Sequence, residues 1–390
     1  MNEQHNPTRK DATRAVHGGE LRPSPGGPLV FPIYQSTVYA STPDAEPEDI
    51  QYIRLSNTPS QRYLHDKLAS LERADAAIAT ASGMSAMTTV IATLLGSGDH
   101  LIAAEGLYGG TYAYIEEHLG RLGVTHTFVD AQRPDTWKAA ITRKTKMFLV
   151  ESISNPMMRI PHLEEVVVFA RKRGLVTVID NTFATPINFK PLEIGFDLCF
   201  HSATKYLNGH SDLVAGCVTG AKDTIEAIRK ALSHVGAALD PHAGFLLARG
   251  LKTLTVRVRA QNANAMRLAG FLSDHPKVAS VHYAGLPSDP DHNRGARLMS
   301  GFGGMLSFRL AGASAAEADE MLAQLQIAYV ATSLGSVETL VTRPAATSHA
   351  SMTADQRERV GIADDLIRVS CGIEDSDDLI SDFHQALAAI

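Results

Sequence analysis

Apolar residues along most of the chain alternate between short continuous runs and longer segments with helical spacing. The runs at 76–80, 100–104, 146–152 and 175–180 are nearly all apolar, as expected of strands that are buried on both faces. Each of the first three runs is followed by a loop and then by a segment with helical spacing. This alternation predicts a mostly parallel sheet that helices cover on both faces.

The pattern changes beyond about residue 245. A long basic amphipathic segment at 251–272 predicts one long helix, and the chain closes on another helical run at 376–390. Short apolar runs lie between them at 278–285, 303–310, 327–333 and 365–372. This pattern predicts a smaller C-terminal α+β domain with an antiparallel sheet.

The first 60 residues are rich in Pro, Gly and Ser and show little periodicity. They predict an extended arm that is too polar and irregular to fold alone. We therefore expect an arm at 1–60, a large α/β domain at 61–245 and a C-terminal domain at 246–390.

Composition narrows the function. The chain has 390 residues, 44% of them hydrophobic, and a formal net charge of −6 without a basic block. This argues against nucleic acid and anionic membranes as partners. No apolar run approaches the roughly 18 residues of a membrane span, and the N-terminus has no apolar signal core. We expect a soluble cytoplasmic protein.

The three cysteines, Cys199, Cys217 and Cys371, lie far apart and form no CxxC pair. The sequence therefore predicts neither a disulfide framework nor a zinc site. No metal is expected in the site.

Four loops follow predicted strands, and open parallel sheets bind ligands at those ends. Ser82, Gly83 and Met84 open a helix, where backbone N–H groups can bind an anion and glycine lets it approach. An ordinary N-cap with a turn glycine is the alternative. In EGLYGGTY, Tyr108 could stack on a flat ligand, or it is an ordinary loop tyrosine.

The other two loops carry an acid and a lysine. Asp180 ends a strongly apolar strand and needs a cationic partner there, unless it caps the next turn. In HSATKYLNGHSD, Lys205 follows Ser202 and Thr204, whose hydroxyls suit a phosphate. Taken alone, Lys205 is more simply a solvated surface charge. Together the loops describe pyridoxal 5′-phosphate, which needs an anion site, a stacking ring, an acid and a lysine.

The chain resembles the Cys/Met-metabolism family of pyridoxal-phosphate enzymes, which includes cystathionine γ-synthase, cystathionine β-lyase, cystathionine γ-lyase and methionine γ-lyase. The resemblance runs from PIYQSTVY through DNTFATP and HSATKYLNGHSD to IRVSCGIED. It implies the PLP-dependent transferase fold (fold type I), with a mostly parallel seven-stranded sheet. Pyridoxal 5′-phosphate is the implied cofactor, and a small sulfur amino acid is the implied substrate.

The resemblance also assigns roles around the cofactor. Lys205 forms the Schiff base with it, Asp180 pairs with the ring nitrogen, and Tyr108 stacks on the ring. Asn155 lies near the 3-oxygen of the ring. The residues assigned to the phosphate are Gly83, Met84, Ser202 and Thr204.

Further roles concern the substrate. By resemblance, Arg368 binds the substrate carboxylate, for which a guanidinium fork is well suited. Ser333 contacts the lysine or the substrate. Lys205 then removes the α-proton and moves a proton from the β-carbon, and Tyr108 is the candidate acid for the departing thiolate.

The predicted function is a carbon–sulfur lyase that acts on cystathionine or a related sulfur amino acid by β- or γ-elimination, of the cystathionine γ-lyase type. Cystathionine γ-synthase, cystathionine β-lyase and methionine γ-lyase stay open, and an aminotransferase is a remote alternative. By resemblance, Thr332 stands where many relatives that act on cystathionine carry Glu. Methionine γ-lyases carry Cys where this chain has Gly110.

Part of the arm, QYIRLSNTPS, resembles a Tyr-x-Arg segment with which the family reaches across a subunit interface. Tyr52 and Arg54 then complete the phosphate site of a neighbouring subunit. The resemblance implies a homo-oligomer, usually a tetramer made of two dimers. At 55–59 this chain reads LSNTP, whereas the family continues with an aromatic residue or glycine and then Asn-Pro-Thr.

Overall fold

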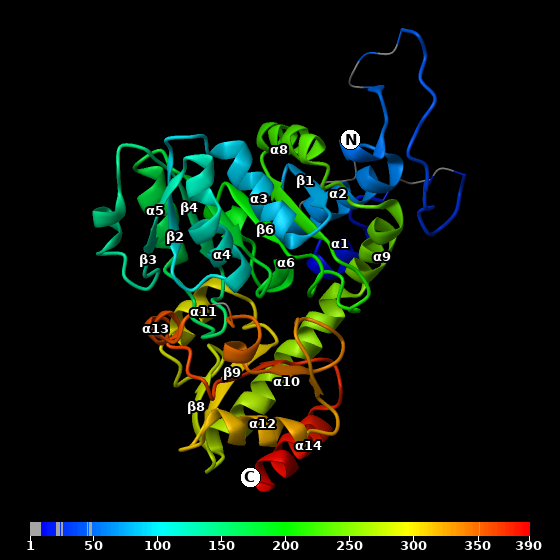
Figure 1. Cartoon of the computed structure of the whole chain (residues 1–390). Coiled ribbons are helices and arrows are strands. Elements are labelled where there is room, and N and C mark those ends of the chain that lie inside the picture. The colour runs from blue at the N-terminus through cyan, green and yellow to red at the C-terminus, as the bar shows by residue number, and fades with distance from the viewer. Residues whose placement is uncertain (1–8, 21–23, 25, 45, 47–48, 351) are drawn as a thin grey trace.

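The computed structural model describes residues 9–20, 24, 26–44, 46, 49–350 and 352–390. Among these residues the strands form one sheet of seven strands and one of five. Figure 1 shows the larger sheet and its helices in the upper part of the molecule and the smaller sheet below them. The N-terminal arm extends outward at the upper right of the same view.

The larger sheet has the strand order β1-β7-β6-β5-β4-β2-β3. Its strands are β1 (Ala76–Thr80), β2 (His100–Ala104), β3 (Thr125–Val129), β4 (Thr145–Glu151), β5 (Val176–Asp180), β6 (Leu198–His201) and β7 (Gly216–Gly220). The strands from β3 across to β6 are parallel, and β7 runs antiparallel to β6 and β1. The predicted seven-stranded, mostly parallel sheet is therefore confirmed.

Burial explains why these strands read as continuous apolar runs. Every residue of β2, β6 and β7 is buried, as expected when helices cover both faces. Two polar residues interrupt these apolar runs at the carboxyl ends of strands. Glu151 is the last residue of β4, and Asp180 is the last residue of β5. These two residues are register partners, so their side chains lie on the same face of the sheet.

Helices pack on the larger sheet along most of its width. The helices of this region are α2 (Pro59–Glu72), α3 (Gly83–Leu94), α4 (Gly109–Glu117), α5 (Leu163–Arg171), α6 (Thr185–Asn188), α7 (Pro191–Ile194), α8 (Lys222–Val235) and α9 (Pro241–Lys252). Short 3₁₀ turns are η3 (Ile53–Leu55), η4 (Leu119–Leu122) and η5 (Trp137–Ala140). Helix α3 packs on α8, β6 and β7, while α2 packs on β1 and α5 on β4 and β5.

The smaller sheet has the order β10-β11-β12-β9-β8. Its strands are β8 (Val278–His282), β9 (Met305–Leu310), β10 (Tyr329–Val330), β11 (Leu340–Thr342) and β12 (Ile367–Ser370). The antiparallel prediction holds for all neighbours except β10 and β11, which are parallel. The accompanying elements are α10 (Leu254–Asp274), α11 (His292–Leu298), α12 (Ala315–Ala323), η6 (Pro344–Ala346), α13 (Ala354–Arg359) and α14 (Ser376–Ala388).

The long helix predicted at 251–272 is wrong at its start. Leu251 and Lys252 end α9, and α10 begins at Leu254. Between them Thr253 has a non-helical ψ of 2° and donates its hydroxyl to Gly250 O at 3.1 Å. This side-chain bond to the backbone competes with helix continuation and explains the break.

The arm contains one helix that the sequence did not predict, α1 (Asp11–His17). The buried ammonium of Lys67 donates to the carbonyls of Ala15, Val16 and Gly18 at 3.0, 2.9 and 3.2 Å. These carbonyls lie at the C-terminal end of α1, where the helix itself supplies no donors. Lys67 of α2 thus holds α1 against the part of the molecule that contains the larger sheet.

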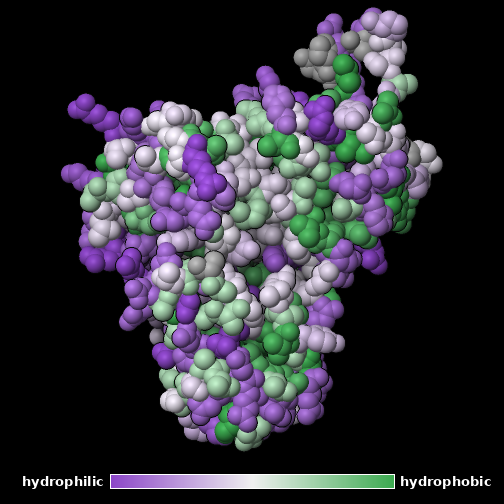
Figure 2. Space-filling view, viewed as in Figure 1, coloured by the Kyte–Doolittle hydropathy of each residue, from purple (hydrophilic) through white to green (hydrophobic). Residues whose placement is uncertain are grey.

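The rest of the described arm exposes large apolar side chains, including Leu29 at 94% and Val38 at 72%. Figure 2 shows apolar residues at the surface along the arm, at the upper right of the view. The domain boundaries at residues 60 and 245 stay predictions. In the described part of the chain, no helix combines the length and apolarity needed to cross a bilayer.

Candidate active site

A cavity of about 650 Å³ lies at the carboxyl ends of the parallel strands, where the C-terminal region meets them. Every predicted site residue outside the arm lines it: Gly83, Met84, Tyr108, Asn155, Asp180, Ser202, Thr204, Lys205, Ser333 and Arg368. Segments from both sheets therefore converge on one space.

The start of α3 forms one end of the cavity. Ser82 is its N-cap, and the Ser82 hydroxyl accepts the N–H of Ser85 at 3.0 Å. The N–H groups of Gly83 and Met84 come first in the helix, where the helix supplies no acceptor. A Cβ atom on Gly83 would lie 2.7 Å from Cβ of Ser202, so glycine lets the two loops touch. The arrangement is an anion cradle that fits a phosphate.

The two predicted hydroxyls differ in their existing bonds. Thr204 donates its hydroxyl to Ala215 O at 3.1 Å and accepts the Ala215 N–H at 3.0 Å. To donate to a phosphate, it must first release the carbonyl. Ser202 is held through its backbone, whose N–H donates to the Thr182 hydroxyl at 2.9 Å.

Asp180 accepts two bonds from Thr182, the N–H at 2.9 Å and the hydroxyl at 2.5 Å, both at Oδ1. The capping alternative is thus present in the structure, and it leaves Asp180 on the cavity wall. Burial raises the pKa of Asp180, which the bonds from Thr182 and the charge of His201 oppose. A cationic ring nitrogen in the cavity would supply the partner that a buried carboxylate needs.

Glu151 also lines the cavity, and the sequence analysis missed it. Its Oε1 accepts the Tyr108 backbone N–H at 2.6 Å. Burial, and then the charge of Asp180, raise the pKa of Glu151 well above its ordinary value. Two neighbouring buried carboxyls cannot both ionise at low cost, and the larger rise in pKa makes Glu151 the more readily protonated of the two. The signal was available, because Glu151 ends an apolar strand just as Asp180 does.

Lys205 points its ammonium into the cavity and donates to Ser333 Oγ at 2.6 Å. Burial, and then the charge of Arg368, lower the pKa of Lys205 to about 8. The surface-charge alternative is therefore wrong for this lysine. Ser333 itself has a φ of 80°, a strained conformation for a non-glycine residue. Such strain is concentrated at functional sites.

Arg368 reaches the cavity from β12. It donates to Asn155 Oδ1 at 3.1 Å and to Ser333 O at 3.0 Å. Burial lowers the pKa of Arg368 to about 10, which leaves it charged. A guanidinium has five N–H donors, so it keeps donors for a carboxylate. Asn155 and Ser333 fix the plane of the fork.

Tyr108 stands at the N-terminus of α4 with 44% of its surface exposed. A Cβ atom on Gly110 would lie 2.6 Å from Cε1 of the Tyr108 ring and 3.2 Å from Met84 Sδ. Glycine at this position therefore lets the ring fold back over its own loop, beside the cavity.

Tyr52 and Arg54 do not line the cavity of their own chain. Arg54 donates to Ser233 O at 2.9 Å, and its guanidinium carbon lies 5.5 Å from the centre of the Tyr52 ring. Their role in a neighbouring subunit stays a prediction.

A second polar cluster, which is buried, is formed by two residues of β6 and the last residue of α2. Glu72 Oε1 is 2.5 Å from His201 Nε2, and Cys199 Sγ is 3.4 Å from the same nitrogen. This bond uses one atom of each residue, whereas Glu72 Oε2 and His201 Nδ1 have no hydrogen-bond partner in the described structure. All three cysteines are free and buried.

Known proteins match this chain over nearly its whole length. The sequence model of a family described as Cys/Met metabolism PLP-dependent enzyme matches residues 12–388. Cystathionine gamma-lyase of Bacillus subtilis is 39% identical, over 98% of this chain and 100% of that one. L-methionine gamma-lyase of Pseudomonas putida is 41% identical, over 97% of each. The crystal structure of cystathionine gamma-lyase from Lactobacillus plantarum, complexed with L-serine, matches with a TM-score of 0.94 at 35% identity, over 98% of this chain and 99% of that one.

Proposed function

The chain belongs to the family of Cys/Met-metabolism PLP-dependent enzymes, and from this we propose that it is a carbon–sulfur lyase for cystathionine or a closely related sulfur amino acid. It is an enzyme of fold type I that uses pyridoxal phosphate and acts on small amino acids. The identity of the substrate and the regiochemistry are the proposed part.

The cavity fits the cofactor at its phosphate, its ring nitrogen and its aldehyde carbon. The N–H groups of Gly83 and Met84 and the hydroxyl of Ser202 would hold the phosphate. Asp180 would keep the ring nitrogen protonated, and Lys205 would hold the aldehyde carbon. When bound, pyridoxal phosphate supplies an electron sink that stabilises negative charge at the substrate α-carbon.

The residues of this chain then divide the remaining work. Arg368 binds the α-carboxylate and fixes the orientation of the amino acid. The amine of Lys205, with its pKa near 8, takes up the α-proton and returns a proton during elimination. Tyr108, at the mouth of the cavity, donates a proton to the departing sulfur.

One observation carries this proposal: Lys205, Ser333 and Arg368 form a bonded chain inside a single cavity. The Ser333 hydroxyl accepts a hydrogen bond from the amine of Lys205, and the Ser333 carbonyl accepts one from the guanidinium of Arg368. The group that removes the proton is thereby set at a fixed separation from the group that orients the substrate, which supports proton abstraction next to a carboxylate.

Two features bear on the choice among the family's reactions. A Cβ atom at Gly110 would lie 2.6 Å from Cε1 of Tyr108, so the cysteine that the resemblance places there in methionine γ-lyases would require the Tyr108 ring to move. This favours cystathionine over methionine as substrate. Thr332, at the cavity rim, is uncharged where many relatives carry Glu, so binding of the far end of the substrate falls to other groups.

We also propose that the active unit is a dimer. The arm exposes Leu29 and Val38 and carries Tyr52 and Arg54 outside their own cavity. Exposed apolar surface marks interaction sites. An arm that crosses to a second copy would bury this surface and add a cation to the phosphate cradle.

The test is a substrate panel of cystathionine, methionine, homocysteine, cysteine and O-acylhomoserines. We expect cystathionine to give 2-oxobutyrate and cysteine without an added thiol. Pyruvate with homocysteine would instead assign β-elimination. Turnover of O-acylhomoserine only when a thiol is supplied would assign γ-replacement and overturn the lyase proposal. Transfer of the amino group to a keto acid would assign an aminotransferase.

A further inference from the structure

The loop from Ser154 to Ile160 lies between β4 and α5, contacts the C-terminal region, and carries Asn155, the partner of Arg368. It is closed on itself, since Ser154 N–H donates to Arg159 O at 2.9 Å and Arg159 N–H donates to Ser154 Oγ at 3.1 Å. A loop closed in this way moves as a unit. Whatever holds its far end also places Asn155.

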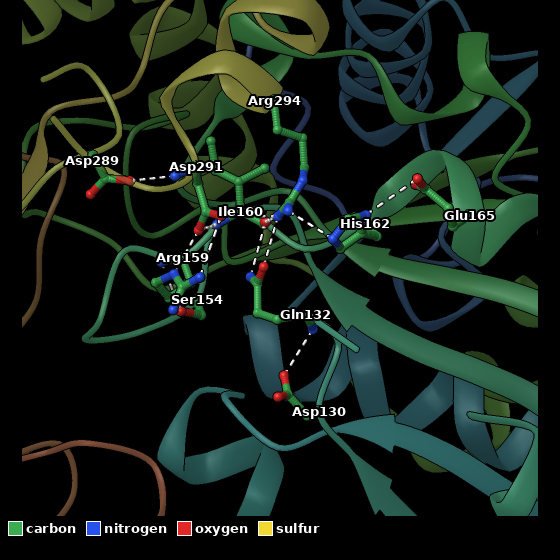
Figure 3. Close-up of polar contacts among 10 residues, drawn as sticks. All are labelled: Asp130, Gln132, Ser154, Arg159, Ile160, His162, Glu165, Asp289, Asp291 and Arg294. Carbon is green, nitrogen blue, oxygen red and sulfur yellow. Dashed lines mark hydrogen bonds and ion pairs between the residues drawn. The ribbon is translucent and has the colours of Figure 1, made fainter. Parts of the chain in front are cut away.

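The far end is held by Asp291, which comes just before α11. Figure 3 shows its carboxylate among side chains of both regions of the molecule. Oδ2 accepts Nε of Arg159 at 2.6 Å and the N–H of Ile160 at 3.0 Å, and Oδ1 accepts Nη1 of Arg294 at 3.0 Å. The Asp291 side chain is only 1% exposed. We refer to these four residues as the Asp291 clamp.

Arg294 ties the clamp to further segments of the large region. It donates to Gln132 Oε1 at 2.7 Å, to the carbonyl of Ile160, and lies 2.7 Å from His162 Nε2. A buried carboxylate with two guanidinium partners and a backbone N–H is well compensated, and its loss leaves those cations unpaired. The clamp therefore sets a defined geometry between the regions.

The near end of the loop meets the strand next to Arg368. Ser307 in β9 donates its hydroxyl to Pro156 O at 2.8 Å. Ser307 is the register partner of Arg368 in β12. The loop that carries Asn155 is thus held by the clamp at one end and by the small sheet at the other. Asn155 Oδ1 accepts a hydrogen bond from the guanidinium of Arg368.

We propose that Asp291 is a positioning residue for Arg368. It holds the loop so that Asn155 fixes the plane of the guanidinium and directs the remaining N–H groups toward the α-carboxylate of the substrate. This rests on the proposed function only in taking Arg368 as the carboxylate site. The Asp291 carboxylate has no hydrogen bond to Asn155 or Arg368 in the described structure. It acts on them through Arg159 and Ile160.

A purely structural role for Asp291 predicts a different result, and the same helix offers a control. Arg297 in α11 pairs with Glu164 in α5 at 2.7 Å, across the same two regions. Their side chains are 59% and 47% exposed, and neither forms a hydrogen bond or ion pair with the loop at 154–160 in the described structure. Glu164→Gln therefore removes an interregion ion pair without touching Asn155.

The experiment compares Asp291→Asn with Glu164→Gln as holoenzymes. Binding of L-methionine, and of the amine that methionine gives on decarboxylation, is followed through the absorbance of the bound cofactor. We expect Asp291→Asn to weaken methionine binding about tenfold and to leave amine binding and cofactor content unchanged. Glu164→Gln should match the wild type for both ligands. Equal weakening of both ligands, or none, would overturn the positioning role.

Two further variants keep the test decisive if Asp291→Asn does not fold. Arg159→Gln breaks the clamp from the loop side and should reproduce the selective loss. In an Asn155→Ala background, Arg159→Gln should add little, because the relay is already cut. Additive losses would overturn the inference. If the wild type binds methionine and its amine equally well, Arg368 is not the carboxylate site, and the proposed function fails together with the inference.

Discussion

The cavity loops and the N-terminal arm differ in how far one chain completes them. Lys205, Asp180 and Arg368 are each bonded to side chains or backbone of the same chain and are buried around one space. The arm does the opposite, since it holds Leu29 at 94% exposure and carries Arg54 outside its own cavity. The first region can be understood from a single copy. The proposed dimer would supply the partner that the second region lacks in a single copy.

The strongest test of the cavity is removal of its amine. Lys205→Ala should lower turnover by at least about 10³-fold, because both the covalent anchor and the general base are lost. Borohydride reduction of the wild-type holoenzyme, followed by peptide mapping, should place the cofactor label on the peptide that contains Lys205. A label on another lysine would show that Lys205 is not the lysine that binds the cofactor.

The arm is tested by mixing two inactive variants. Arg54→Ala should lower activity by about 100-fold or more, since an unpaired buried charge costs about 2–5 kcal/mol. Mixed with Lys205→Ala under subunit exchange, it should recover about a quarter of wild-type activity. Half of the dimers are then mixed, and each has one intact site.

The control for the mixing experiment is each variant incubated alone under the same conditions. If exchange is demonstrated by mass and no activity returns, Arg54 serves its own chain, and the contrast between cavity and arm disappears.

The pKa of Lys205 sharpens the description of the cavity. Burial lowers this pKa from 10.5 to about 8, so the uncharged amine becomes more abundant as pH rises toward 8. Covalent capture of added pyridoxal phosphate by the cofactor-free protein should therefore speed up about tenfold per pH unit below pH 8 and level off above it. A rate that keeps rising to pH 10 would indicate an ordinary exposed lysine.

The smallest effect is expected at Glu151. Glu151→Gln keeps a neutral acceptor for the Tyr108 N–H, so turnover should stay within about threefold of the wild type. Glu151→Ala leaves that N–H unpaired at a cost of about 1–3 kcal/mol, and activity should fall about tenfold. Equal loss in both variants would mean that Glu151 works as an anion and not as the protonated partner of Asp180.

Sequence patterns predicted the large sheet and the loops around its cofactor edge because both follow from local rules. Continuous apolar runs marked the strands, and the polar residues at their ends marked the loops. The same rule would have found Glu151. The roles of Asn155, Ser333 and Arg368 came from the family resemblance, because nothing in their local sequence reveals a shared cavity.

Other features depend on contacts that no short window of sequence contains. Asp291 binds Arg159 across 132 positions, and neither residue ends a strand. Helix α1 has seven residues, too few to be stable alone, and its end is held by Lys67 of another helix. The break between α9 and α10 turns on one hydroxyl of Thr253. Tertiary context decides each of these.

The proposed base and the guanidinium that is proposed to bind the substrate carboxylate belong to different sheets. Lys205 follows β6 of the larger sheet, whereas Arg368 lies within β12 of the smaller one. Substitutions in β12 therefore act first on how an amino acid is held, and they reach the base only through Ser333 and the charge of Arg368. The anchoring of the amino acid and the movement of its proton are therefore encoded in separate stretches of the chain, more than 160 positions apart, and meet only in the folded protein.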